Sequence, residues 1–222
     1  MRRNSSTIVV LAGQVPAEVL AAASRSMNVA LYRPEAPAGT EGDDDGLAAA
    51  PLAASTALEA GTAALQRAGR SSSPYALVPA DPLAAVAARW REMWDLSRPP
   101  GPSAFEAEAA LALAAWRAGR FELPDYYLVL GTETADASDE AAPVPDFYLG
   151  PLRSARSHRV VLVPATEPAV QAEGVLHALG SLRPGPWWPG LDQVIETARR
   201  FYPSSLTETA AVTLAGGPGR AG

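Results

Sequence analysis

Two carboxylates, Asp81 and Glu167, lie where the chain could carry out chemistry, because each follows an apolar run typical of a buried strand. Arg33 and Thr166 supply a cation and a hydroxyl just after similar runs. Two carboxylates can divide general-acid and general-base work when their surroundings move their pKa values apart. Together with Arg33 and Thr166, they could also bind a polar metabolite. Helix capping is a complete alternative explanation for Asp81, which precedes Pro82, and Thr166 could cap a helix in the same way.

The two carboxylates belong to a motif that occurs three times in the chain. Each copy has an unbroken apolar run, then small residues, then proline, then a helical stretch, and the copies begin at Val9, Ala76 and Val161. Unbroken hydrophobicity is typical of a parallel strand covered on both faces, and proline suits the first turn of a helix. Since ligands of open α/β sheets bind at the carboxyl ends of the strands, we expect the three turns to lie side by side there.

The chemistry of these turns favours some ligands over others. Helix N-termini attract anions, but the carboxylates of Asp81 and Glu167 would occupy the free N–H groups and repel phosphate. The hydroxyls of a sugar-like molecule, an amine or a metal ion fit this edge better. One hypothesis is therefore an enzyme that acts on a small polar metabolite through Asp81, Glu167 and Arg33.

Motifs that would identify a cofactor or a familiar nucleophile are absent from the sequence. The chain has no cysteine, which excludes zinc ribbons, iron–sulfur sites and thiol nucleophiles. All 18 lysine-plus-arginine positions are arginine, which excludes a Schiff-base lysine and a phosphate-loop lysine. Neither the three-glycine dinucleotide fingerprint nor a G-x-S-x-G nucleophile elbow occurs. We predict no cofactor and no metal site, and the sequence leaves open whether the protein is an enzyme.

Trp187 and Trp188 form the least ordinary part of the chain, a pair flanked by proline and glycine at 184–186 and 189–190. Adjacent side chains diverge, so we expect one indole to pack beneath the loop and the other to lie at the surface. Prolines restrict the backbone and leave little entropy to lose on binding, which suits a contact surface for a partner chain or a flat ligand. The alternative is a loop that only fastens two helices to the sheet.

A second candidate contact surface is the cationic segment that contains Arg153, Arg156, His158 and Arg159. In an acidic chain, such a segment could dock an anionic metabolite or an acidic partner segment. The alternative is a solvated loop that balances the acidic loops nearby. Together with the tryptophan pair, this segment supports the other hypothesis, a non-catalytic protein that acts by binding a partner protein or a small molecule.

The elements that must position these residues alternate between strand and helix. Strands are predicted at 8–12, 28–32, 75–78, 126–130 and 160–163, and helices at 16–25, 51–68, 83–94, 103–118, 168–180 and 191–202. Such alternation implies parallel pairing through right-handed crossovers. The predicted fold class is α/β, a Rossmann-like three-layer α/β/α sandwich with a mostly parallel central sheet. Phe147–Leu149 is expected to be an edge strand with room for antiparallel pairing.

One domain, residues 1–206, is expected to contain all of these elements. It would carry acidic loops at 34–50 and 131–146, and residues 207–222 would form a disordered tail. Ser103 and Glu106 have the spacing of a capping box, which would start a helix at Ser103.

The composition limits the partners and the location of the protein. A net charge of −6 and a pI near 5.0 argue against sequence-independent binding to nucleic acid. No apolar run approaches the roughly 18 residues of a membrane helix, and the first run is too short for a signal peptide, so we expect a cytoplasmic protein. The 46 alanines and the absence of lysine indicate a GC-rich bacterial genome. The sequence does not indicate an oligomeric state.

Overall fold

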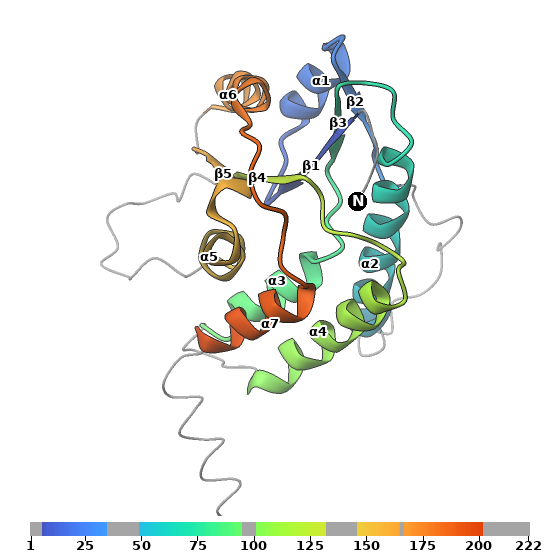
Figure 1. Cartoon of the computed structure of the whole chain (residues 1–222), viewed down its shortest axis with the longest axis vertical. Coiled ribbons are helices and arrows are strands. Elements are labelled where there is room, and N and C mark those ends of the chain that lie inside the picture. Colours follow the sequence, from blue (N-terminus) through green and yellow to red (C-terminus); the bar gives the residue numbers. More distant parts are fainter. Residues whose placement is uncertain (1–5, 35–48, 95–100, 132–145, 165–166, 202–222) are drawn as a thin grey trace, which may run out of the picture.

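A computed structural model describes residues 6–34, 49–94, 101–131, 146–164 and 167–201 (Figure 1). The strands within these ranges are β1 (Thr7–Ala12), β2 (Val29–Leu31), β3 (Tyr75–Val78), β4 (Tyr126–Leu130) and β5 (Val160–Val163). The α-helices are α1 (Ala17–Arg25), α2 (Ala49–Ala68), α3 (Ala84–Glu92), α4 (Gly101–Arg117), α5 (Arg153–Ala155), α6 (Pro168–Ser181) and α7 (Leu191–Arg200). A turn of π-helix, Tyr148–Leu152, leads into α5, and a 3-10 turn, Ser157–Arg159, leads into β5.

The sheet has five strands in the order β2-β3-β1-β4-β5, with β1 at its centre. All four pairings are parallel, which confirms the predicted α/β class and the parallel central sheet. Rossmann folds have the strand order 3-2-1-4-5. Here the second and third strands are exchanged, so the Rossmann-like part of the prediction is not confirmed.

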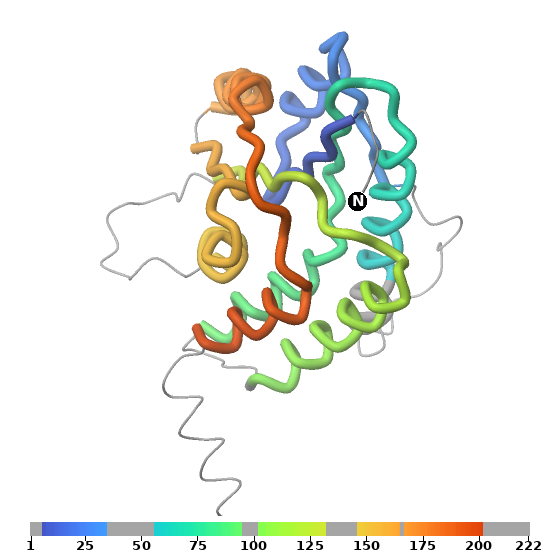
Figure 2. Tube along the Cα trace, in the orientation of Figure 1, coloured from blue at the N-terminus to red at the C-terminus, as the bar shows by residue number. Residues whose placement is uncertain are grey.

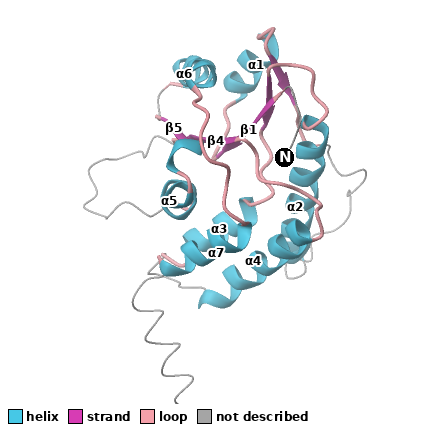
Figure 3. Ribbon diagram, viewed as in Figure 1, coloured by secondary structure: helices cyan, strands magenta, loops and turns pink. Residues whose placement is uncertain are grey.

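Helices cover both faces of the sheet, which confirms the three-layer arrangement (Figures 1 and 3). On one face, α1 and α6 bury Val9 and Leu11 of β1. On the other face, α2, α3, α4 and α7 enclose the core that contains Ile8 and Val10. Successive side chains of β1 therefore enter opposite cores, as a strand covered on both faces requires. The edge strand β5 is less buried than its sequence predicts, because Leu162 is 44% exposed.

The predicted edge strand at 147–149 is wrong. This segment enters the π turn at 148–152, and Asp146 lies two residues before that turn. The Asp146 Oδ1 atom accepts hydrogen bonds from the N–H groups of Tyr148 (2.8 Å) and Leu149 (3.0 Å). A helical turn directs several of its apolar side chains to one side, whereas a strand would send them alternately to opposite faces.

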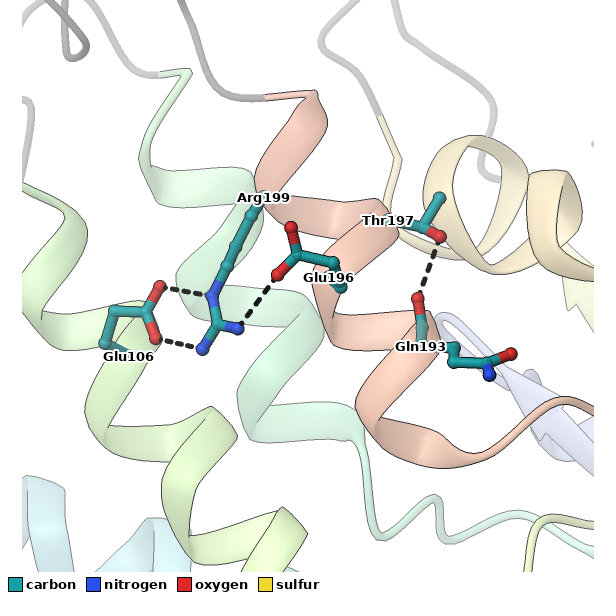
Figure 4. Close-up of polar contacts among 5 residues, drawn as sticks. All are labelled: Glu106, Gln193, Glu196, Thr197 and Arg199. Carbon is teal, nitrogen blue, oxygen red and sulfur yellow. Dashed lines mark hydrogen bonds and ion pairs between the residues drawn. The ribbon is translucent and has the colours of Figure 1, made fainter.

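The predicted capping box at Ser103 is also wrong, because α4 begins two residues earlier, at Gly101. Pro102 then occupies the first turn, where a missing N–H costs little. Glu106 instead reaches α7, where its two carboxylate oxygens accept hydrogen bonds of 2.9 and 2.7 Å from Arg199 (Figure 4). Glu196 approaches the same guanidinium at 3.3 Å, so this group of charges joins α4 to α7.

Some predicted features lie outside the described residues. These are nearly all of the acidic loops predicted at 34–50 and 131–146, the tail predicted at 207–222, and Thr166. In the parts of the chain that the structure describes, no helix has the length and apolar character needed to cross a membrane.

Candidate functional site

The turns after β1, β3 and β5 begin at the carboxyl-end edge of the sheet, as predicted, but only the first two follow neighbouring strands, because β4 lies between β1 and β5. Gly13 follows β1 with a φ of +96°, and a Cβ atom there would lie 2.8 Å from the carbonyl oxygen of Leu130. The Gln171 side chain of α6 donates to the carbonyls of Gly131 (2.9 Å) and Pro164 (3.3 Å). The backbone is therefore closely packed between β1 and β4, the place where a ligand of an open α/β sheet would bind.

The predicted ligand-binding residues are not brought together. Arg33 follows β2 and Glu167 follows β5, and these are the two outermost strands of the sheet. Four spacings of about 4.8 Å place the two strands about 19 Å apart. Arg33 is exposed, and its carbonyl accepts a hydrogen bond from Arg67. Glu167 precedes α6 and is also exposed, and its side chain makes no capping hydrogen bond.

Asp81 is the predicted site residue with the most structured surroundings. The residue is buried, with 7% of its surface exposed. The Oδ1 atom accepts hydrogen bonds from the backbone N–H of Leu83 (3.0 Å) and the hydroxyl of Tyr127 (3.2 Å), and Oδ2 accepts one from the hydroxyl of Tyr148 (2.7 Å). Because α3 begins at Ala84 and Leu83 occupies its cap position, Asp81 stabilises the turn before the helix and is not its N-cap.

Burial and hydrogen bonding act on the Asp81 carboxylate in opposite directions. Burial raises its pKa to about 6, although the hydrogen bonds from Tyr148, Leu83 and Tyr127 favour the charged form and limit the rise. Burial, followed by the nearby Asp81 charge, raises the pKa values of both tyrosines well above their ordinary value. At neutral pH the carboxylate is therefore mostly ionised, and both phenols remain protonated donors. These contacts tie β3 to β4 and to the π turn.

Tyr127 and Tyr148 are the residues of this cluster that the sequence prediction missed. Tyr127 lies in β4 and Tyr148 in the π turn, with their ring centroids 5.7 Å apart. The available signal was a tyrosine inside an otherwise apolar strand, since a buried phenol needs a hydrogen-bond partner. That signal predicts a buried polar atom and does not identify Asp81 as the partner.

A groove of about 420 Å³ lies between α2 and α4. Leu58 and Ala63 of α2 line it together with Leu111 and Ala114 of α4, and Arg120 lies at one end. None of the predicted site residues lines this groove. It therefore gives no support to the hypothesis of a metabolite site at the carboxyl-end edge.

The tryptophan pair separates as predicted. Trp188 is 5% exposed, and its Nε1–H donates to the carbonyl of Pro124 at 2.6 Å. Its ring and the Tyr127 ring form a T-shaped pair, with 5.8 Å between centroids and 81° between planes. Trp187 is 45% exposed. It lies in an exposed stretch, residues 183–187, which we call the Trp187 loop.

The Trp187 loop lies at the amino-end edge of the sheet, opposite to the turns that carry Asp81 and Glu167. The connection from α6 to α7 passes from one helical layer to the other (Figure 2). On its way it contacts Pro124 and Arg159, which lie just before β4 and β5. The Trp187 loop and the turn that carries Asp81 therefore lie toward opposite ends of the strands, with Tyr127 and Trp188 packed between them.

Arg159 holds the Trp187 loop against the residue before β4. It is 5% exposed, and its guanidinium donates to three carbonyls, those of Pro186 (2.7 Å), Asp125 (2.8 Å) and Gly185 (2.8 Å). Its Cζ atom also lies 4.6 Å from the centroid of the Trp187 ring, within the range of a cation–π interaction.

Two further residues of the cationic segment hold the same loop. The Nε–H group of Arg156 donates to the carbonyl of Trp187 at 2.6 Å, and Nε2 of His158 lies 3.0 Å from the carbonyl oxygen of Pro186. Gly185 packs so closely on the His158 ring that a Cβ atom would overlap it. The tryptophan pair and the cationic segment, which the sequence suggested as separate surfaces, therefore form a single one, with Arg153 exposed one turn before Arg156.

Among the described residues, no group of three His, Asp or Glu side chains is arranged to hold a metal ion. Comparison of the chain with protein-family models, with curated proteins and with solved structures found no match.

Proposed function

We propose that this protein is a non-catalytic binding protein of the bacterial cytoplasm, and that it recognises a partner protein through the Trp187 loop. The observation that carries the proposal is an indole that is exposed and yet held in place. Trp187 is 45% exposed, while its carbonyl accepts a hydrogen bond from Arg156 and its ring lies over the guanidinium of Arg159.

A fixed and exposed indole suits binding for two reasons. Ordering a flexible side chain at an interface costs about 0.5–1.5 kcal/mol, and here that order exists before any partner arrives. Tryptophan and arginine are also among the residues that contribute most to binding free energy at interfaces. Trp188 already fastens the loop to the sheet, because its indole is buried and hydrogen-bonded to Pro124. Trp187 is therefore available for contact with another molecule.

The test compares partner capture by immobilised wild type, Trp187→Ala and Phe201→Ala from lysates of cells that express the protein. Phe201 is a matched control, since it is an aromatic residue that is 40% exposed at the end of α7. We expect at least one protein that wild type and Phe201→Ala retain and that Trp187→Ala retains at least about tenfold less. Circular dichroism and thermal unfolding establish that the variants are folded. Equal retention of every captured protein by Trp187→Ala would overturn the proposal.

A second candidate function is turnover of a small polar metabolite at the carboxyl-end edge. The observation that favours it is the pKa of Asp81, which burial raises to about 6, because perturbed carboxylates are frequent in active sites. Structural hydrogen-bond networks perturb pKa values as well. The three donors around Asp81, and the separation of Arg33 from Glu167, favour a structural role for this carboxylate.

A further inference from the structure

We infer that the partner segment bound by the Trp187 loop is acidic and carries a large apolar side chain. This inference rests on the proposed function and identifies the chemistry of its partner. It follows from the distribution of charge around the loop and from the way in which the indole of Trp187 is held.

Two stretches of the chain that lack acidic residues meet at this surface. The chain holds 24 aspartates and glutamates, but none lies at 147–166 or at 174–191. Hydrogen bonds join the two stretches, from Arg156 to the carbonyl of Trp187 and from Arg159 to those of Gly185 and Pro186. The fold therefore gathers arginines around the Trp187 loop on a chain whose net charge is −6. Asp125 is an acidic residue beside Arg159, and its carboxylate accepts a hydrogen bond from the N–H group of Ile8 at 2.7 Å.

The arginines of this surface can reach a bound segment. Arg153 and Arg183 have exposed side chains, and Arg156 is half-buried. Arg159 lies beneath the indole and adds a fourth positive charge. Hydrogen bonds between a guanidinium and a carboxylate are charge-assisted and often bidentate. Acidic side chains of a partner would gain these contacts, whereas basic side chains would be repelled.

The indole accounts for the apolar part of the inference. One face of the Trp187 ring lies over Arg159 at 4.6 Å, and the ring is still 45% exposed. Pro184 and Pro186 are exposed in the same short loop. An aromatic or branched aliphatic side chain of the partner would remove this apolar surface from water, at about 25 cal/mol for each Å² buried.

A single-stranded nucleic acid could also combine stacking with phosphate contacts. Such binding needs a positively charged groove that follows the backbone over several nucleotides. The described positive surface is confined to one end of the sheet, and the whole chain is acidic. The observations therefore favour a protein segment, and nucleic acid becomes one outcome of the test.

The test is a selection of random peptides, displayed on phage, on the immobilised full chain. The same selection is run on the double variant Arg153→Glu/Arg183→Glu and on Arg200→Glu. Arg200 is an exposed arginine in the last turn of α7 and serves as the matched control. Wild type and Arg200→Glu should enrich acidic peptides that contain Phe, Tyr, Trp or Leu. The double variant should lose this enrichment, and Trp187→Ala should bind a selected peptide at least about tenfold more weakly.

Three results would overturn the inference. One is enrichment of neutral or basic peptides by wild type, and another is equal enrichment of acidic peptides by the double variant. The third is full displacement of a selected peptide by an equal concentration of oligothymidylate, since the surface would then bind polyanions in general. If capture from lysates requires Trp187 while the selected peptides are not acidic, the proposed function stands and this inference alone fails.

Discussion

At the scale of single residues, Asp81 is a charge that the fold removes from water and then supplies with donors. An ionised carboxylate buried without partners would be very costly. Here two phenols and one backbone N–H group donate to it. The donors come from β4, the π turn and the residue before α3, so Asp81 connects three elements. The pKa still rises to about 6, which means that burial outweighs the hydrogen bonds.

This balance predicts how the free energy of unfolding depends on pH. The pKa of Asp81 is about 6 in the folded protein and 3.8 ordinarily, so the unfolded chain loses this proton first. The contribution of Asp81 to stability is therefore complete below pH 3.8 and is lost as the pH rises through about 6. The loss should amount to about 3 kcal/mol.

Urea denaturation of wild type and Asp81→Asn at several pH values measures this contribution, because the asparagine does not titrate. The stability of wild type relative to the variant should decrease from pH 4 to pH 7 and then remain constant. A difference between the two proteins that does not change with pH would show that Asp81 titrates normally in the folded state.

The sequence predicts the behaviour of some of these residues and not of others. Divergence of Trp187 and Trp188 could be predicted, because adjacent side chains cannot share one environment. The cluster around Asp81 could not, because Tyr148 is 67 positions away and β1 lies between the strands that precede Asp81 and carry Tyr127. The anchoring role of Arg159 could not be predicted either, since its acceptors are backbone carbonyls, which every residue possesses.

At the scale of elements, the hydrophobic pattern of the sequence was sufficient to predict those strands whose packing follows that pattern. The predicted strands at 75–78, 126–130 and 160–163 have the observed bounds, because their apolar runs are unbroken. The segment at 147–149 was wrongly predicted because its aromatic residues have high strand propensity. The signal that decides its structure is the preceding residue, Asp146, whose side chain accepts hydrogen bonds from the first N–H groups of a helical turn.

The connection between α6 and α7 is the element whose order depends most on a single side chain. Replacement of Arg159 by Leu removes donors from three carbonyls, two of which belong to the Trp187 loop. Hydrogen bonds to charged groups contribute about 1.5–3 kcal/mol each, and water can replace part of that loss at exposed carbonyls. We therefore expect a destabilisation of about 2–3 kcal/mol together with loss of order in the loop.

Hydrogen exchange measured by mass spectrometry localises this effect. Arg159→Leu should accelerate exchange at 183–188 and in the first turn of α7, while exchange in α1 and β1 stays close to that of wild type. Arg156→Leu is the control, because Arg156 donates to only one carbonyl of the loop. Uniform acceleration across the chain would indicate that Arg159 supports the whole core and has no special role in the loop.

At the scale of the whole molecule, the two edges of the sheet differ in their chemistry. The carboxyl-end edge has Asp81 buried beneath tyrosines and Glu167 exposed, whereas the amino-end edge carries arginines around an exposed indole. A partner with acidic side chains would therefore be attracted by one end of a molecule that, taken as a whole, repels it. Whether the local attraction or the overall repulsion dominates depends on the distance over which charges act in solution.

The rate of association with an acidic peptide should therefore pass through a maximum as salt is added. The Debye length is about 30 Å at 0.01 M salt, so an approaching peptide experiences the whole net charge of −6, and the rate is low. At about 0.15 M the Debye length is about 8 Å, so distant acids are screened while the nearby arginines still attract. At 1 M it is about 3 Å, and this attraction is lost as well.

Stopped-flow fluorescence with a labelled peptide from the selection measures these rates. For Arg153→Glu/Arg183→Glu, which lacks the attraction, the rate should only rise with salt. A wild-type rate that falls steadily from the lowest salt would contradict this prediction, because the local arginines would then outweigh the net charge at every distance.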